Sequence, residues 1–286
     1  MPTKWTKLAM RLLVIVAIAI AVNDRATADP AKPVRLAVVL APSFSGLMTD
    51  LIADFKSQGG PDVEVVAGID IYDRARAGAA DIVISHYGFS EVERFVQEGY
   101  GRWPRTVFSN QMVIIGPKAD PAHIRGAPSA ADAFQRIANA RAPFVANALP
   151  AVMHLTDYLW ERAGRPEKGD WYLDDGTSKG QAIKLADEKG AYVIWGAPPF
   201  LQFLDKHASS LDILVASDPI FQRAMCTIVV DPGKVQGVNL EGAEDFQRYL
   251  LSSRAQARVA AFRAPNKPDL QLWWPAALHN DSGGAP

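Results

Sequence analysis

The clearest hydrophobic pattern lies between Val34 and Phe55, where a short apolar run is followed by a helical stripe. Apart from Arg35, residues 35–40 are apolar and include β-branched side chains, which predicts a strand buried on both faces. After Pro42, apolar residues recur at spacings of three and four from Phe44 onward, which predicts an amphipathic helix. The turn at residues 43–46 is therefore expected to present backbone N–H groups at the carboxyl end of a sheet, a position that suits an anion.

Strand and helix patterns continue to alternate as far as Gly101. Apolar runs predict strands at residues 63–66 and 81–85, and amphipathic spacing predicts helices at 71–77 and 89–98. A chain that alternates in this way forms a parallel sheet whose loops gather at the carboxyl ends of its strands.

An extended run at residues 111–116, followed by Pro117, predicts that the chain crosses here into a second lobe. The alternation resumes there, and the β-rich run at 225–230 predicts a return to the first lobe. The other predicted elements are helices at 129–140, 151–163, 178–188, 241–252 and 254–262, and strands at 143–146, 191–195 and 211–216.

These patterns predict an α/β fold of two lobes, each with a mainly parallel sheet flanked by helices. The first lobe is expected to contain residues 29–112 and 223–265, and the second lobe residues 113–222. Residues 266–286 are expected to form a C-terminal strap and tail.

The first 28 residues have the pattern of a cleavable signal peptide. Basic residues precede an apolar run from Leu12 to Val22, and Ala26-Thr27-Ala28 fits a cleavage site with small residues. The other interpretation is an uncleaved membrane anchor, but this run is shorter than the roughly 20 residues that span a bilayer. We therefore expect a periplasmic protein.

Composition narrows the functional classes. The chain has 286 residues, 49% of them hydrophobic, with 30 basic and 31 acidic side chains. The first 28 residues hold four of the basic and one of the acidic residues, so the exported chain has a net charge of −4. No basic patch with interleaved aromatic residues predicts nucleic-acid binding. Cys226 is the single cysteine, which excludes an internal disulfide.

Several short motifs resemble the exported tungstate-binding proteins of ABC transporters, within the type II periplasmic binding protein superfamily. The resemblance extends from about Val34 to Phe262. Its motifs are Asp81-Ile-Val-Ile-Ser-His86, Phe95-Val-Gln-Glu-Gly-Tyr-Gly101, Val113-Ile-Ile-Gly-Pro-Lys-Ala-Asp-Pro121, Trp171-Tyr172, Glu188-Lys-Gly-Ala-Tyr192 and Val238-Asn-Leu-Glu-Gly-Ala243. The resemblance implies a monomer that clamps an oxyanion between two lobes and delivers it to a transporter permease.

The residues at the expected ligand site differ from that family. The Ser-Arg-Gly-Asp-x-Ser-Gly-Thr-His segment of the tungstate binders aligns with residues 146–154, and only His154 is shared. Each charge-assisted hydrogen bond is worth about 1.5–3 kcal/mol, so losing an arginine and several hydroxyls predicts weaker oxyanion binding. Two ligand classes stay open: tungstate or molybdate, which the resemblance implies, and a small organic solute, which the more aromatic pocket suggests.

The candidate ligand-binding residues follow predicted strands or precede predicted helices. They are Ser43, Phe44, Ser45, Asp70, Ser85, His86, Tyr87, Asn147, Thr177, Ser178 and Trp195. Alternatively, Ser43 and Ser45 cap their own helix and His154 is structural. Lys179 and Arg223 are further candidates for a positive charge in the cleft.

The sequence contains no motif of an enzyme, a metal site or a cofactor site. Cys226 could be paired with His86 or His154 as a nucleophile, but a lone cysteine in a β-rich run is usually buried and inert. We therefore expect an exported solute-binding protein that needs no cofactor. The alternative is a periplasmic ligand-sensing or partner-binding module without a transport role.

Overall fold

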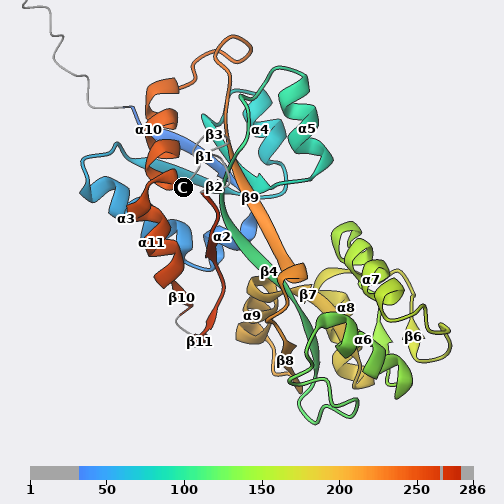
Figure 1. Cartoon of the computed structure of the whole chain (residues 1–286). Helices are drawn as coiled ribbons and strands as arrows, with labels where there is room; N and C mark the ends of the chain where they lie inside the picture. Colours follow the sequence, from blue (N-terminus) through green and yellow to red (C-terminus); the bar gives the residue numbers. More distant parts are fainter. Residues whose placement is uncertain (1–31, 265–266, 278–286) are drawn as a thin grey trace, which may run out of the picture.

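The computed structural model describes residues 32–264 and 267–277, so the predicted signal peptide lies outside the described residues. The elements form two lobes, with two long strands running between them (Figure 1). From the start to the first long strand they are β1 (Val34–Val38), α2 (Leu40–Phe44), α3 (Leu47–Ser57), β2 (Val63–Ala67), α4 (Ile71–Arg76), β3 (Ile82–His86), α5 (Ser90–Gln97) and β4 (Arg105–Pro117).

The second lobe follows β4, and the chain then returns along β9 to the first lobe. The second-lobe elements are α6 (Ala130–Asn139), β5 (Phe144–Val145), α7 (Pro150–Arg162), β6 (Tyr172–Leu173), α8 (Lys179–Lys189), β7 (Tyr192–Gly196), α9 (Ala197–Lys206), β8 (Leu211–Val215) and the 3₁₀ helix η1 (Pro219–Phe221). The returning elements are β9 (Gln222–Val229), α10 (Leu240–Leu251), α11 (Ser253–Ala261), β10 (Arg263–Ala264), β11 (Lys267–Gln271) and β12 (Trp274–Pro275).

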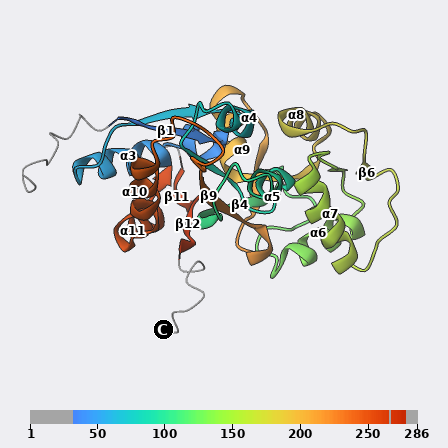
Figure 2. The ribbon, with the colours of Figure 1, turned by 90° about the horizontal axis from the view of Figure 1, so that it is seen from above.

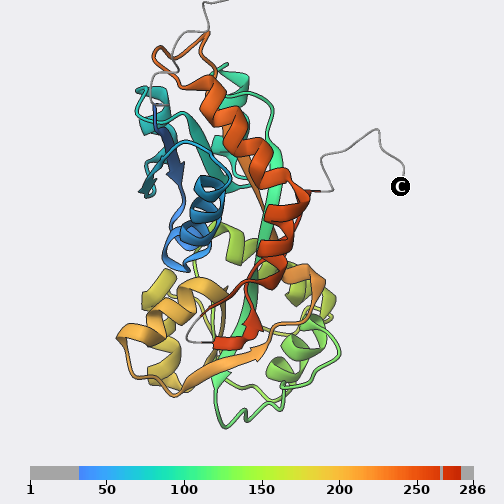
Figure 3. The ribbon, with the colours of Figure 1, turned by 90° about the vertical axis from the view of Figure 1, so that its left-hand side faces the viewer.

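Strands β4 and β9 join the sheets of both lobes. In the first lobe β1 lies between β2 and β3, and all three are parallel. In the second lobe β5 lies between β6 and β7, also in parallel. Both β4 and β9 are antiparallel to their neighbours, and in Figure 3 the long green strand β4 passes from one lobe into the other. The predicted two-lobed α/β fold is confirmed, with antiparallel strands at its centre.

Alternation along the strands explains why helices cover both faces of each sheet. On β1, Leu36 belongs to the cluster packed by α3, α10 and α11, whereas Ala37 belongs to the cluster packed by α4 and α5. On β7, Val193 packs with α8 and α9, whereas Ile194 packs with α6 and α7. Successive strand residues point to opposite faces, so an apolar run needs a helical layer on each side. Figure 2 shows α3, α10 and α11 of the first lobe at one end and α6 and α7 of the second lobe at the other, with α4, α5 and α9 between them.

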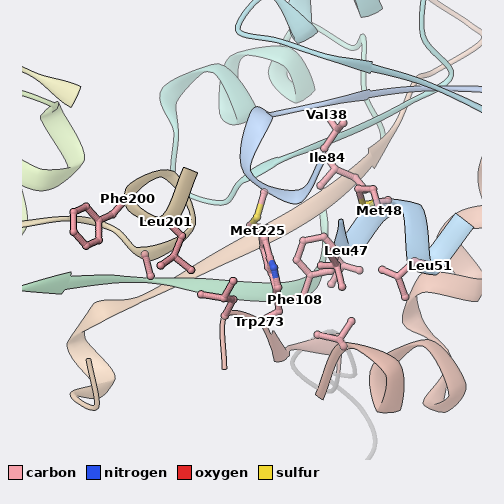
Figure 4. Packing of buried hydrophobic residues seen from close by; sticks show 14 of the residues in the cluster. Val38, Leu47, Met48, Leu51, Ile84, Phe108, Phe200, Leu201, Met225 and Trp273 are labelled. Atoms are coloured by element: carbon pink, nitrogen blue, oxygen red, sulfur yellow. The ribbon is translucent and has the colours of Figure 1, made fainter. Parts of the chain in front are cut away.

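The largest apolar cluster continues from one lobe into the other. Figure 4 shows Phe108 of β4 and Met225 of β9 at its centre, with Leu47 of α3 on one side and Leu201 of α9 on the other. Trp273, which is completely buried, belongs to the same cluster and stacks edge-on against Phe108 at 5.3 Å between ring centres. The C-terminal strap therefore contributes to the core near the crossing strands.

The turn after β1 differs from the prediction. The single helix expected from Phe44 is divided, because Phe44 ends the short helix α2 and a second helix, α3, begins at Leu47. Gly46 between them has φ = 87°, a left-handed conformation that a glycine adopts without a steric penalty. The pattern located the apolar face correctly but could not show this break.

Helix α9 and strand β12 are among the elements absent from the prediction. Helix α9 begins with Ala197 followed by two prolines, which look like helix breakers in a sequence but are tolerated in a first turn, where N–H groups have no intrahelical partner. Strand β12 pairs with β4, aligning Trp274 with Ser109.

Of the helices formed by residues 32–264 and 267–277, none has the length and apolar character of a bilayer span.

An ionic cluster joins α3 to the two C-terminal helices. The almost completely buried Asp54 carboxylate accepts hydrogen bonds from Arg254 Nε at 2.8 Å and from the Tyr249 hydroxyl at 3.0 Å. Arg258 donates to both oxygens of Asp50, one turn earlier, at 3.0 and 2.6 Å. The hydrogen bond from Arg254 is the main reason that the Asp54 pKa is lowered to about 2.

We expect Asp54→Asn to unfold at lower urea concentration than the unmodified chain at pH 7. The ionised carboxylate stabilises the fold fully above its ordinary pKa of 3.8, and this contribution disappears as the pH falls toward 2. The two unfolding midpoints should therefore converge between pH 4 and pH 2. Asp62→Asn serves as the control, because Asp62 pairs with Lys56 at an exposed site; equal effects of the two substitutions at pH 7 would contradict the assigned role.

Candidate functional site

Two adjoining cavities lie where the two lobes meet. The hinge cavity, about 390 Å³, is bounded by the crossing strands and by residues from both lobes: Ala41, His86, Phe89, Ser90, Asn110, Gln111, Met112, Leu149, Pro150, Ala151, Val152, Trp195, Gly196, Pro199 and Arg223. The adjoining cavity, about 690 Å³, shares six of these: Ala41, His86, Phe89, Ser90, Trp195 and Pro199. We take the pair as the candidate ligand site.

Arg223 of β9 provides a positive charge at the hinge cavity. Its strand pairs with β4, which aligns Arg223 with Asn110, a second residue lining the cavity. The guanidinium is partly buried, and burial lowers the Arg223 pKa. Within residues 32–264 and 267–277, no carboxylate pairs with it and no hydrogen bond from its side chain is found. Because a desolvated cation without a partner is unfavourable, an anionic ligand would relieve this cost.

His86 ends β3 and lines both cavities. Burial, together with the positive charge of Arg223, lowers the His86 pKa to about 4, although a polar contact with Asn110 acts in the opposite direction. The imidazole is therefore neutral at pH 7, so it offers a hydrogen-bond donor at one nitrogen and an acceptor at the other. Its ring also packs edge-on against Phe89 at 5.4 Å.

The amino ends of three helices border the hinge cavity. Ser90 begins α5, Pro150 begins α7, and Gly196 precedes α9. Helix amino ends carry partial positive charge and N–H groups without intrahelical partners, so they favour an anion. Gly196 also permits close packing, because a Cβ there would lie 2.9 Å from Pro199 Cγ.

Two buried hydroxyl groups line the adjoining cavity. Ser85 is fully buried and Tyr72 almost so, and neither hydroxyl oxygen makes a hydrogen bond of normal geometry to another described residue. A ligand atom or a water molecule in this cavity would find two groups able to bond with it.

The structure gathers four of the predicted ligand residues, Phe44, Ser85, His86 and Trp195, around these cavities. Lys179, also weighed from the sequence, lines the adjoining cavity. The other seven candidates do not line these cavities. Five of them line no cavity described here, and two line separate cavities on the surface.

Ser43, Ser45, Asn147, Thr177 and Ser178 do not line either cavity. The Ser45 hydroxyl donates to the Pro42 carbonyl at 3.3 Å, which is a local role in its own turn. Asn147 is buried; its amide nitrogen donates to the Ile194 carbonyl at 3.3 Å and its oxygen accepts from Lys179 N at 3.0 Å. Asn147 therefore fastens β7 to the start of α8.

Asp70 and Tyr87 line separate surface cavities. Asp70 pairs with Arg74 at 2.9 Å in a cavity of about 380 Å³, which also contains Arg76 and Arg94. Tyr87 is half exposed beside Trp103 in a groove of about 260 Å³.

Several lining residues were not among the predicted set. They include Phe89, residues Asn110, Gln111 and Met112 of β4, the start of α7 from Leu149 to Val152, and Pro199. The helix starts carried a usable signal, because each follows a predicted strand. The β4 residues did not, since their run was interpreted as an ordinary crossing strand.

A cysteine-based catalytic site finds no support in the geometry. Cys226 is buried in the core, and burial raises the pKa of its thiol to about 12, so it is protonated at neutral pH. The adjacent carboxylates of Asp174 and Asp175 do not form a metal site either. They lie in an exposed loop, where Asp175 accepts a hydrogen bond from Thr177 N at 3.0 Å. In the described part of the chain, no three His, Cys, Asp or Glu side chains are grouped to hold a metal ion.

Comparison with known proteins gives consistent matches. A protein of Haloferax volcanii, provisionally named an ABC transporter anion-binding protein, is 32% identical over 254 residues, covering 86% of this chain and 73% of that protein. The tungstate-binding protein TupA of Peptoclostridium acidaminophilum is 29% identical over 232 residues, covering 79% and 80%. The structure of TupA from Desulfovibrio alaskensis G20 matches with a TM-score of 0.72 and 27% identity, covering 86% of this chain and 100% of that one.

These matches agree with the architecture described above. The TupA structure spans both lobes of the present fold, which confirms the type II arrangement. The family model for bacterial extracellular solute-binding proteins matches residues 36–262, which is most of the chain. The chain therefore belongs to the family of bacterial extracellular solute-binding proteins.

Proposed function

We propose that this chain captures a small anion in the hinge cavity and delivers it to the permease of an ABC importer. In this proposal residues 1–28 direct export to the periplasm. The exported chain is a monomer whose two lobes close around the ligand. The first lobe contains residues 29–112 and 223–265, and the second lobe contains residues 113–222. The observation that carries the proposal is Arg223: a partly buried guanidinium that faces a cavity without a carboxylate partner among the described residues.

The surroundings of Arg223 support an anion rather than a cation or a neutral ligand. The starts of α5, α7 and α9 add partial positive charge, and no Asp or Glu lines the hinge cavity among the described residues. The names of the relatives also support an anionic ligand, since one is provisionally named an anion-binding protein and others are named tungstate-binding proteins. Tungstate and molybdate are therefore the first ligands to test.

Arg223 also compensates for a difference noted in the sequence. The arginine of the tungstate-binding motif is absent from residues 146–154, but β9 supplies one from a different part of the chain. A cation in this position can attract the same ligand, although its approach differs because Arg223 lies on a crossing strand.

We expect Arg223→Gln to weaken tungstate binding at pH 7.5 by roughly 10- to 100-fold, measured by titration calorimetry. This range follows from about 1.5–3 kcal/mol for a hydrogen bond to a charged group, at about 1.4 kcal/mol per tenfold change. Arg162→Gln is the matched control, because Arg162 is exposed at the end of α7 and far along that helix from the cavity. Equal affinities for the Arg223 variant and the unmodified chain would refute the assigned role of Arg223.

We expect His86 to titrate near pH 4 in the ligand-free chain. The titration is followed by NMR of the imidazole signals, and the His86 signal is assigned by its absence in His86→Gln. The unfolded chain binds this proton near the ordinary value of 6.5, whereas the folded chain does not until about pH 4. The free energy of unfolding should therefore decrease as the pH falls from 6.5 to 4, and His86→Gln should remove part of that decrease. A midpoint near 6.5 would show that His86 is solvated and would contradict its burial in the site.

A further inference from the structure

We propose that the ligand is an organic anion, whose acidic group binds at Arg223 in the hinge cavity and whose apolar body occupies the adjoining cavity. This inference rests on the anion binding proposed above and specifies the class of ligand. It separates an organic acid from a bare inorganic oxyanion, which has no apolar surface to bury.

The first argument is the character of the adjoining cavity. Its walls are mostly apolar or aromatic, formed by Val39, Leu40, Ala41, Phe44, Ile69, Ile71, Tyr72, Phe89, Trp195 and Pro199. Three of these side chains are exposed to an unusual extent for their size: Leu40 at 49%, Ile69 at 88% and Phe89 at 39%. Large apolar side chains exposed around one hollow indicate a surface that an apolar group covers.

The second argument is how charge is distributed between the two cavities. In the described chain Arg223 is the residue of the hinge cavity that is charged at neutral pH, and His86 beside it is neutral. The charged residues of the adjoining cavity are Glu91, which already pairs with Arg94 at 2.6 Å, and Lys179, which is exposed to solvent and, unlike Arg223, is not desolvated. The acidic group therefore belongs at Arg223, with the remainder of the ligand directed away from it.

The third argument is that apolar walls come from both lobes. Phe89 lies at the start of α5 in the first lobe, whereas Trp195 and Pro199 lie at the end of β7 and the start of α9 in the second. Closure brings these walls onto whatever is bound. An inorganic dianion would lose hydration against them without gaining hydrogen bonds, whereas an apolar body would gain from being removed from water.

The size of the site agrees with this class. Pockets for organic ligands commonly measure about 300–1,000 Å³, and each of the two cavities falls within that range. Because the cavities share His86, Phe89 and Trp195, one molecule can occupy both.

The test is titration calorimetry of the exported chain with pairs of anions that share a head group. Phenylphosphonate is compared with inorganic phosphate and benzoate with acetate, and tungstate is measured in parallel. We expect each aromatic member to bind at least about tenfold more tightly than its partner, and phenylphosphonate to bind more tightly than tungstate. Tight tungstate binding with no aromatic preference would overturn this inference and leave the proposed anion function intact. Failure of every anion to bind would contradict both this inference and the proposed anion function.

Two substitutions locate the apolar body. Trp195→Ala and Phe89→Ala should each reduce phenylphosphonate affinity by a several-fold larger factor than phosphate affinity, whereas Arg223→Gln should weaken both by a similar factor. Trp103→Ala is the control, because Trp103 is 75% exposed in a separate groove. Circular dichroism tests whether each variant is folded. If Trp195→Ala does not fold, Phe89→Ala still tests the placement of the apolar body. Unchanged phenylphosphonate affinity in folded Phe89→Ala and Trp195→Ala would contradict the placement.

Discussion

The antiparallel pairing of β4 with β9 is the interaction on which the rest of this structure depends. These strands continue the sheet from one lobe to the other, and their ladder aligns Asn110 with Arg223 where the cavities open. The parallel strands on either side then direct their carboxyl ends toward the same region, so His86 and Trp195 reach the site from opposite lobes. The geometry of the site is therefore fixed largely by backbone hydrogen bonds.

Desolvation sets the electrostatic state of the site. The same burial that makes an unpaired Arg223 unfavourable keeps His86 neutral, so the cavity has one full positive charge at neutral pH rather than two. A single fixed cation, supplemented by helix amino ends, attracts an anion without strongly repelling the apolar parts of a ligand. If the ligand is the organic anion proposed above, the aromatic walls also take part in selection, which a site formed only of hydroxyl donors would not allow.

Local patterns predicted the architecture well, because strands buried on both faces and helices with one apolar face leave distinct periods in a sequence. The period of residues 34–55 predicted β1 and the apolar face of α3, but the break at Gly46 depends on one backbone conformation and left no trace in that period. Among site residues, His86 and Trp195 were predictable because each ends a strand. Asn147 also follows a strand closely, yet its amide bonds to β7 and to the start of α8, which only the tertiary structure shows. Arg223 was one of two candidate cations for the cleft in the sequence, and what distinguishes it in the described chain is its partial burial at the hinge cavity without a carboxylate partner.

The burial of Cys226 has a consequence for the redox chemistry of this chain. Its thiol lies within the core beneath α4 and α5 and is protonated at neutral pH, whereas oxidation and thiol exchange require an accessible thiolate. With no second cysteine in the chain, no internal cross-link can form either. The folded chain therefore offers no accessible thiolate for oxidation or thiol exchange, and its stability does not depend on a disulfide.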